Sequence, residues 1–315
     1  MNRKLCWNTV LRPLRNRLFI FRAFTMKCIF CEQESTASKS VEHIIPESLG
    51  NLSTVLPRGI VCDKCNNYFA RKVEGPFLGS DVMRRLRQEL EIKTKNGKFI
   101  TAFDYPRVGK EYVKQISKDD YLIYTQEEKT QADLTKMLQE YQECHEETDR
   151  ALLVYNEYVA RFLAKAAIEY FVYRCGSVNE VCEYVRTDAV FKSLREYARY
   201  GNHQSWPYNV RRIYSRNEAY KGDPFSSIAW EADFLFLGNG EIYFVVVIHG
   251  IEYSINMLIP SSDGYKKWLN ENLEQSPLHI SEGVLVNCVR DYIETMFSEA
   301  EKEELKSYFT KHAKI

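Results

Sequence analysis

The chain has 315 residues, of which 45% are hydrophobic and 27% are charged, a mixture typical of globular proteins. No uncharged apolar run approaches the ~18 residues that a membrane helix needs, so we expect no membrane partner. The formal net charge is zero but unevenly distributed: the first 100 residues carry 18 Lys and Arg against 9 Asp and Glu, and the remainder carries 25 against 34. The basic N-terminal third predicts a polyanionic partner.

Residues 1–25 contain six Lys and Arg and no acidic residue. This composition is typical of an organellar presequence. Alternatively, the natural chain starts at Met26, two residues before the first cysteine pair, and we favour this second interpretation. In both cases the segment is a basic extension that we leave out of the fold prediction.

Residues 26–80 are predicted to be short, turn-rich elements. A tight turn at Cys28–Cys31 is followed by a short strand at 41–45 and a second tight turn at Cys62–Cys65. Residues 67–74 predict a helix that ends at Gly75-Pro76, because a proline inside a helix removes a hydrogen bond.

Residues 81–315 predict a mixed α+β domain of unknown role, with several amphipathic helices and a β-meander. Helices are expected at 81–95, 131–147, 155–175, 191–200 and 289–312, a hairpin at 92–100, a strand at 121–124, and the meander at 228–259. We therefore expect an α+β protein in three parts: the extension 1–25, a small module 26–80 and an accessory domain 81–315.

Four of the nine cysteines form two CxxC pairs, Cys28/Cys31 and Cys62/Cys65. Two such pairs can close a tetrahedral Cys₄ zinc site without an open position, so the metal is expected to be structural. A redox CxxC would lie near a βαβ pattern, which surrounds neither pair. Paired metal-binding cysteines rather than a disulfide framework suit a cytoplasmic protein, which is the location we expect.

Three segments carry a resemblance to a known family: CIFC at Cys28–Cys31, EHIIPESLGN at Glu42–Asn51 and VCDKCNNYF at Val61–Phe69. Together they resemble the HNH endonucleases, the ββα-metal nucleases, in the form where two zinc knuckles bracket the site. The resemblance covers about residues 26–80. It implies a zinc-stabilised ββα-metal module that hydrolyses phosphodiester bonds of nucleic acid, most simply DNA.

The resemblance also implies residue roles. His43 would be the general base, Glu42 and Asn66 would hold a catalytic Mg²⁺ or Mn²⁺, and Asn51 would fix the backbone behind His43. The residue types suit this chemistry, because imidazole titrates near neutrality and hard cations prefer oxygen ligands. Neighbouring strand residues point to opposite sides, so Glu42 and His43 need not block each other. The pattern departs from the commonest one at Asn66, where histidine is usual, and at Glu42, where aspartate is frequent.

Basic side chains near the site are candidate phosphate contacts. These are Arg58, Lys64, Arg71 and Lys72, with Arg84, Arg85 and Arg87 extending the positive field. The alternative for each of them is that it lies on a solvent-exposed basic surface and contacts no phosphate. Further along, Arg161 and Lys165 lie four residues apart on one helix face and could reach nucleic acid, but we favour their interpretation as solvated surface charges.

Two other functions fit the same residues. The knuckles could form a non-catalytic module that binds nucleic acid or protein, although a pure binder has no need of Glu42, His43 and Asn66 together. The site could also cut RNA, since hydrolysis there does not depend on a 2′-hydroxyl. Substrate structure, cut position and oligomeric state are not indicated by the sequence.

Overall fold

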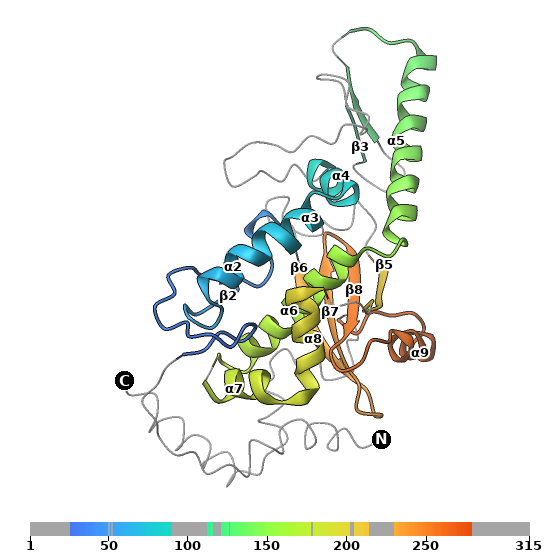
Figure 1. Cartoon of the computed structure of the whole chain (residues 1–315). Helices are drawn as coiled ribbons and strands as arrows, with labels where there is room; N and C mark the ends of the chain where they lie inside the picture. Colours follow the sequence, from blue (N-terminus) through green and yellow to red (C-terminus); the bar gives the residue numbers. More distant parts are fainter. Residues whose placement is uncertain are drawn as a thin grey trace.

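The computed structural model describes residues 26–89, 112–115, 121–213 and 230–278, except positions 50, 52, 126, 178 and 202–204. The extension 1–25, the hairpin at 92–100 and the helix at 289–312 lie outside these residues. The described part is a mixed α+β structure with antiparallel sheets (Figure 1), as predicted. Within it, no helix combines the length and the apolar character that crossing a membrane requires.

The N-terminal elements are very short. Strand β1 (Glu42–His43) pairs antiparallel with β2 (Val55–Leu56), and the turn η1 (Glu47–Leu49) lies between them. Helix α2 (Asp63–Phe69) begins directly after Cys62, whose sulfur accepts a hydrogen bond from the Cys65 amide. With two residues per strand, this region has little backbone pairing to hold it together.

The helix after the second knuckle continues past the point at which we expected it to end. A π-helical turn, η2 (Ala70–Glu74), follows α2 and leads into α3 (Gly75–Leu78). The Gly75 amide bonds to the Ala70 carbonyl, five residues back. Pro76 then lies in the first turn of α3, a position at which proline is tolerated. The predicted end at Gly75-Pro76 is therefore wrong.

Next in the chain comes α4 (Asp81–Glu89), followed by an arm that projects from the body (Figure 1). The arm consists of the hairpin of β3 (Tyr112–Gln115) and β4 (Tyr121–Tyr124) and the long helix α5 (Gln131–Leu152). A small separate core of Val113, Tyr141 and Cys144 joins hairpin to helix.

Helix α6 (Glu157–Arg174) lies at the centre of the molecule, and 14 of its 18 residues are buried. It packs beside α7 (Asn179–Thr187) and α8 (Ala189–Tyr200). Helix α8 ends at Gly201, whose φ of +64° suits a residue without a Cβ.

The main sheet has the order β5-β8-β7-β6 and is antiparallel throughout. Its strands are β5 (Tyr208–Arg212), β6 (Trp230–Phe236), β7 (Ile242–Ile248) and β8 (Ile251–Asn256). The consecutive pairing of β6, β7 and β8 confirms the predicted meander. Helix α9 (Asp263–Glu271) packs Tyr265 and Leu269 against Tyr243 of β7.

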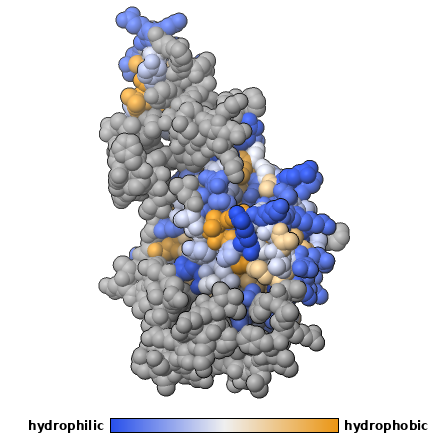
Figure 2. Space-filling model, turned by 90° about the vertical axis from the view of Figure 1, so that its left-hand side faces the viewer, coloured by the Kyte–Doolittle hydropathy of each residue, from blue (hydrophilic) through white to orange (hydrophobic). Residues whose placement is uncertain are grey.

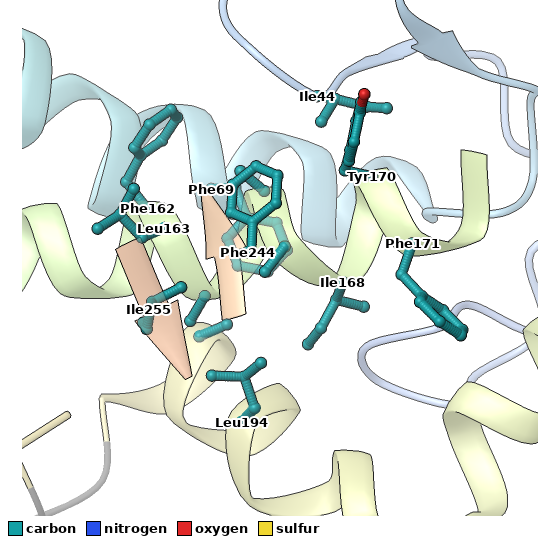
Figure 3. Packing of buried hydrophobic residues seen from close by; sticks show 14 of the residues in the cluster. Ile44, Phe69, Phe162, Leu163, Ile168, Tyr170, Phe171, Leu194, Phe244 and Ile255 are labelled. Atoms are coloured by element: carbon teal, nitrogen blue, oxygen red, sulfur yellow. The ribbon is translucent and has the colours of Figure 1, made fainter. Parts of the chain in front are cut away.

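One hydrophobic core joins the N-terminal elements to the helices and the sheet. Figure 3 shows Ile44 and Phe69 in the same cluster as Phe162 of α6, Phe244 of β7 and neighbouring residues. The closest aromatic contact across the boundary is the stack of Phe77 on Phe162, with ring centroids 4.4 Å apart. The division into parts at residue 80 stays a prediction, but the two parts share their interior.

The described surface seen in Figure 2 is mainly hydrophilic, and its hydrophobic residues gather in small patches.

Candidate functional site

Four cysteine sulfurs converge between the first turn and the start of α2. The Sγ atoms of Cys28, Cys31, Cys62 and Cys65 all lie within 4.8 Å of one another, and those of Cys31 and Cys62 are 3.5 Å apart. A tetrahedral zinc site with bonds of ~2.3 Å places its sulfurs about 3.8 Å apart, whereas a disulfide would need ~2.05 Å. The cluster therefore fits a zinc ion, as the spacing predicted.

The cluster favours at least one thiolate even without a metal. The side-chain contact from Cys65 lowers the pKa of Cys28 to about 5, despite the opposing effect of burial. Arg199 of α8 donates from Nε to the Cys65 sulfur at 3.4 Å, and its guanidinium stacks on Tyr68. The contact with Cys28 and burial raise the pKa of Cys65, and Arg199 opposes that rise. The thiolate is the form that binds metal.

Two more arginines from the central helices contact the knuckles. Arg195 of α8 pairs with Glu32 at 2.8 Å, and Arg161 of α6 donates to the Tyr68 hydroxyl at 2.9 Å and to backbone carbonyls of α8. Arg161 is only 7% exposed, so its interpretation as a solvated surface charge is wrong. The sequence carries no periodic signal that separates such an arginine from a surface one.

Asn51 locks the loop between β1 and β2. Its Nδ2 donates to the carbonyls of Ile45 and Thr54, and its Oδ1 accepts from the amides of Ser53 and Thr54. The side chain is buried and all of its partners are backbone groups. Four bonds of this kind fix the loop that follows β1; the role of Asn51 in catalysis stays a prediction.

His43 lies at the end of β1 with its side chain 26% exposed. Its Nε2 is 3.3 Å from the Glu47 carboxylate in η1. Its Nδ1 is buried, and no hydrogen-bond partner for it exists among the described residues. The sequence analysis did not single out Glu47, although the spacing of four residues after His43 was a readable signal.

The Glu42 carboxylate points the other way, into the protein, as the alternation of strand side chains predicts. It is 6% exposed, and its Oε1 is 2.8 Å from the Lys165 ammonium of α6. Burial raises the pKa of Glu42, and Lys165 opposes that rise. Lys165 itself is 0% exposed, so its interpretation as a surface charge is wrong, and it is a site neighbour that sequence analysis missed.

Asn66 lies beside the start of β1. Its Nδ2 donates to the Val41 carbonyl at 3.1 Å, so its side chain is held one residue away from Glu42 along the strand. This bond ties Asn66 of α2 to the backbone beside β1, whose Glu42 and His43 side chains point to opposite sides. No bond to the Asn66 Oδ1 is present among the described residues.

The basic residues divide into exposed and engaged groups. The four nearest candidates, Arg58, Lys64, Arg71 and Lys72, are all exposed. Arg85 is instead 3.7 Å from Glu147 and donates to Thr148 of α5. Arg87 is buried, which contradicts its expected place in a surface field. Burial lowers its pKa.

Comparison with known proteins finds one family. No curated protein and no solved structure matches the chain. Residues 28–81, which contain all four cysteines together with Glu42, His43, Asn51 and Asn66, match the family described as HNH endonuclease. This segment of the chain is thus similar to the HNH endonuclease family.

Proposed function

We propose that the protein is a metal-dependent endonuclease that hydrolyses DNA phosphodiester bonds at His43. The observation that carries the proposal is the placement of His43. Its imidazole lies partly exposed at the end of β1, on a loop locked by Asn51, beside a cysteine cluster that holds the neighbouring turn. Such a preorganised base is what water activation needs.

His43 takes a proton from the attacking water. Nε2 is the nitrogen nearer the exposed Glu47 carboxylate, at 3.3 Å. The carboxylate can only accept a hydrogen bond, so Nε2 carries the proton of the neutral imidazole and the proton from water goes to Nδ1. The negative charge of Glu47 then stabilises the imidazolium that forms.

A divalent cation would be held by Glu42 and Asn66. The available donors suit Mg²⁺ or Mn²⁺, because both are oxygen atoms. The buried Glu42 Oε2 and His43 Nδ1 have no hydrogen-bond partner among the described residues, and buried atoms of this kind ordinarily contact water, an ion or protein. When bound, the cation supplies charge stabilisation to the phosphate and the leaving oxygen.

The exposed cations Arg58, Lys64, Arg71 and Lys72 would contact the phosphate backbone. They carry no base-reading geometry, so their contribution is affinity and salt dependence rather than sequence specificity.

The test is cleavage of supercoiled plasmid by the full, zinc-loaded chain with Mg²⁺ or Mn²⁺. His43→Ala should lower the rate about 10²–10⁴-fold, the usual contribution of a general base, with zinc content unchanged. Glu47→Gln should lower it about tenfold, whereas Glu140→Gln, an exposed α5 carboxylate, should have no effect. Undiminished cleavage by His43→Ala would rule out this base.

One observation favours a second function, a non-catalytic nucleic-acid binder. The Glu42 carboxylate is already paired with the Lys165 ammonium at 2.8 Å, an arrangement that forms without a metal. A binder would shift labelled nucleic acid in a gel at every cation concentration without yielding products. Running the same assay on duplex DNA, single-stranded DNA and RNA separates DNA cleavage from the RNA-directed alternative.

A further inference from the structure

Lys165 is a buried ammonium surrounded by oxygen atoms. It lies on α6, about 80 residues beyond the segment that matches the HNH family, and its side chain is 0% exposed. Its Nζ is 2.8 Å from Glu42 Oε1, 2.8 Å from Glu74 Oε1, 2.9 Å from Glu169 Oε2 and 3.1 Å from the His43 carbonyl.

The four partners come from three elements. Glu42 and His43 form β1, Glu74 is the last residue of the π-helical turn η2, and Glu169 is one turn along α6 from Lys165 itself. Strand β1 carries the candidate base, and the helix that runs into η2 carries Asn66. One ammonium therefore connects the two elements whose relative position determines how Glu42, His43 and Asn66 lie relative to one another.

The π-helical turn places Glu74 in this cluster. Its extra residue rotates everything that follows by about 100° relative to a regular α-helix, so an uninterrupted helix would present a different side chain to Lys165. Such turns are frequent at functional sites. Here the turn brings Glu74 of η2 to the same Lys165 ammonium that Glu169 of α6 contacts.

Stability alone does not account for the cluster. Burying charges costs free energy that their mutual attraction often fails to recover, and apolar residues of similar size are frequently as stable. The cluster also holds three carboxylates against one ammonium.

We propose that Lys165 is a positioning residue of the nuclease site: its ammonium fixes the Glu42 carboxylate and the His43 backbone, while Glu74 and Glu169 hold the ammonium in place. The inference rests on the proposed nuclease function. It makes α6 part of the catalytic centre, although the family segment ends before it. Because Lys165 contacts Glu42 through Oε1, it leaves Oε2 as the oxygen available to a cation.

The test compares Lys165→Met with Lys192→Met, an exposed lysine of α8. Both variants are made in the full chain and assayed for plasmid cleavage, zinc content and thermal unfolding. Lys165→Met should lower kcat on the order of 100-fold, as expected when reacting groups lose alignment, with KM for DNA changed less than about twofold. Lys192→Met should match the wild type in each measurement.

Chemical rescue separates positioning from a purely structural role. Lys165→Ala removes a side-chain segment equivalent to n-propylammonium, so this amine should restore part of kcat at constant ionic strength. Tetramethylammonium, which cannot donate hydrogen bonds to the carboxylates, should restore none. Rescue by both cations alike would contradict the proposed contacts.

Two further variants guard against misfolding. Lys165→Met/Glu169→Gln removes one of the carboxylates left unpaired, and Glu74→Gln changes the least buried partner, which is 15% exposed. Both should fold, bind zinc and show lowered kcat. Full activity in these two variants, whether or not Lys165→Met folds, would overturn the proposal. A wild-type chain that cleaves no nucleic acid would instead refute the nuclease function itself.

Discussion

The N-terminal module and the central helices and sheet are held together by different means. In the module, strands β1 and β2 have two residues each, and the tight turns converge on four sulfurs. In the central helices and sheet (α6 to α8 and β5 to β8), which we call the scaffold, α6 is buried over 14 of its residues and β7 and β8 are buried throughout. The module therefore carries the cysteine cluster and the candidate site residues, and the central helices and sheet supply the packing and the buried cations that contact them.

The largest expected effect is loss of the metal. Structural zinc contributes on the order of 10 kcal/mol to the folding of small modules. Chelation, or Cys65→Ser, should therefore unfold residues 26–78 and expose the face of α6 that they cover. Hydrogen exchange should show protection lost in α2 and in part of α6, and retained in β7.

Cys182→Ser is the matched control for that experiment, because Cys182 is a buried cysteine of α7 outside the metal cluster. Zinc content and exchange in α2 should remain those of the wild type. If chelation left α2 fully protected, the module would be held by the shared core alone, and the contrast between the two regions would be wrong.

Phe162→Ala should have the next largest effect, because Phe162 lies where the regions meet. Its ring stacks on Phe77 at 4.4 Å and is 0% exposed. Truncating a buried phenylalanine costs about 3–5 kcal/mol through lost burial and the cavity left behind. Denaturant unfolding followed by tryptophan fluorescence and by zinc release should give one coincident transition at lower midpoint. Separate transitions would show that the two regions unfold independently.

The two regions also differ in how much of their structure could be predicted from the sequence. The four cysteines, Asn51 and His43 are recognisable because their chemistry demands particular residue types at short spacings. The helices and the meander are recognisable from hydrophobic periodicity. Those signals are local, and they predicted the module and the α+β class.

The missed features depend on contacts between distant segments. Lys165 reaches Glu42 across 123 positions and Arg199 reaches Cys65 across 134. In a helix pattern a buried, paired cation looks like a surface cation, because both are charged residues among apolar ones. The continuation of the helix through Gly75 and Pro76 was missed for a related reason: the π-helical turn that accommodates it has no sequence signature of its own.

The smallest expected effect is a pair of opposite pH dependences, one in each region. In the module, the hydroxyl and amide of Ser40 lower the pKa of Asp63. In the scaffold, burial raises the pKa of Asp233 on β6 from 3.8 to about 6, although Arg174 opposes the rise. A group with a lowered pKa stabilises the fold above its unfolded pKa and loses that contribution as acid protonates it. A carboxyl group with a raised pKa destabilises the fold above its unfolded pKa, and this destabilisation disappears as acid protonates it.

Asp63→Asn should therefore lower stability at pH 7 and approach the wild type as the pH falls below about 4. The free energy of unfolding of Asp233→Asn should increase relative to that of the wild type as the pH rises from about 4 to above 6, by on the order of 1–3 kcal/mol. Thermal unfolding of both variants from pH 3.5 to 8 checks the signs. If the stability differences of the two variants from the wild type changed with pH in the same direction, one of these carboxylates would have a different environment from the one described. Asp63 accepts hydrogen bonds from the amides of residues 39 and 40, so an unexpected sign for Asp63→Asn would mean that this connection to the start of α2 does not form.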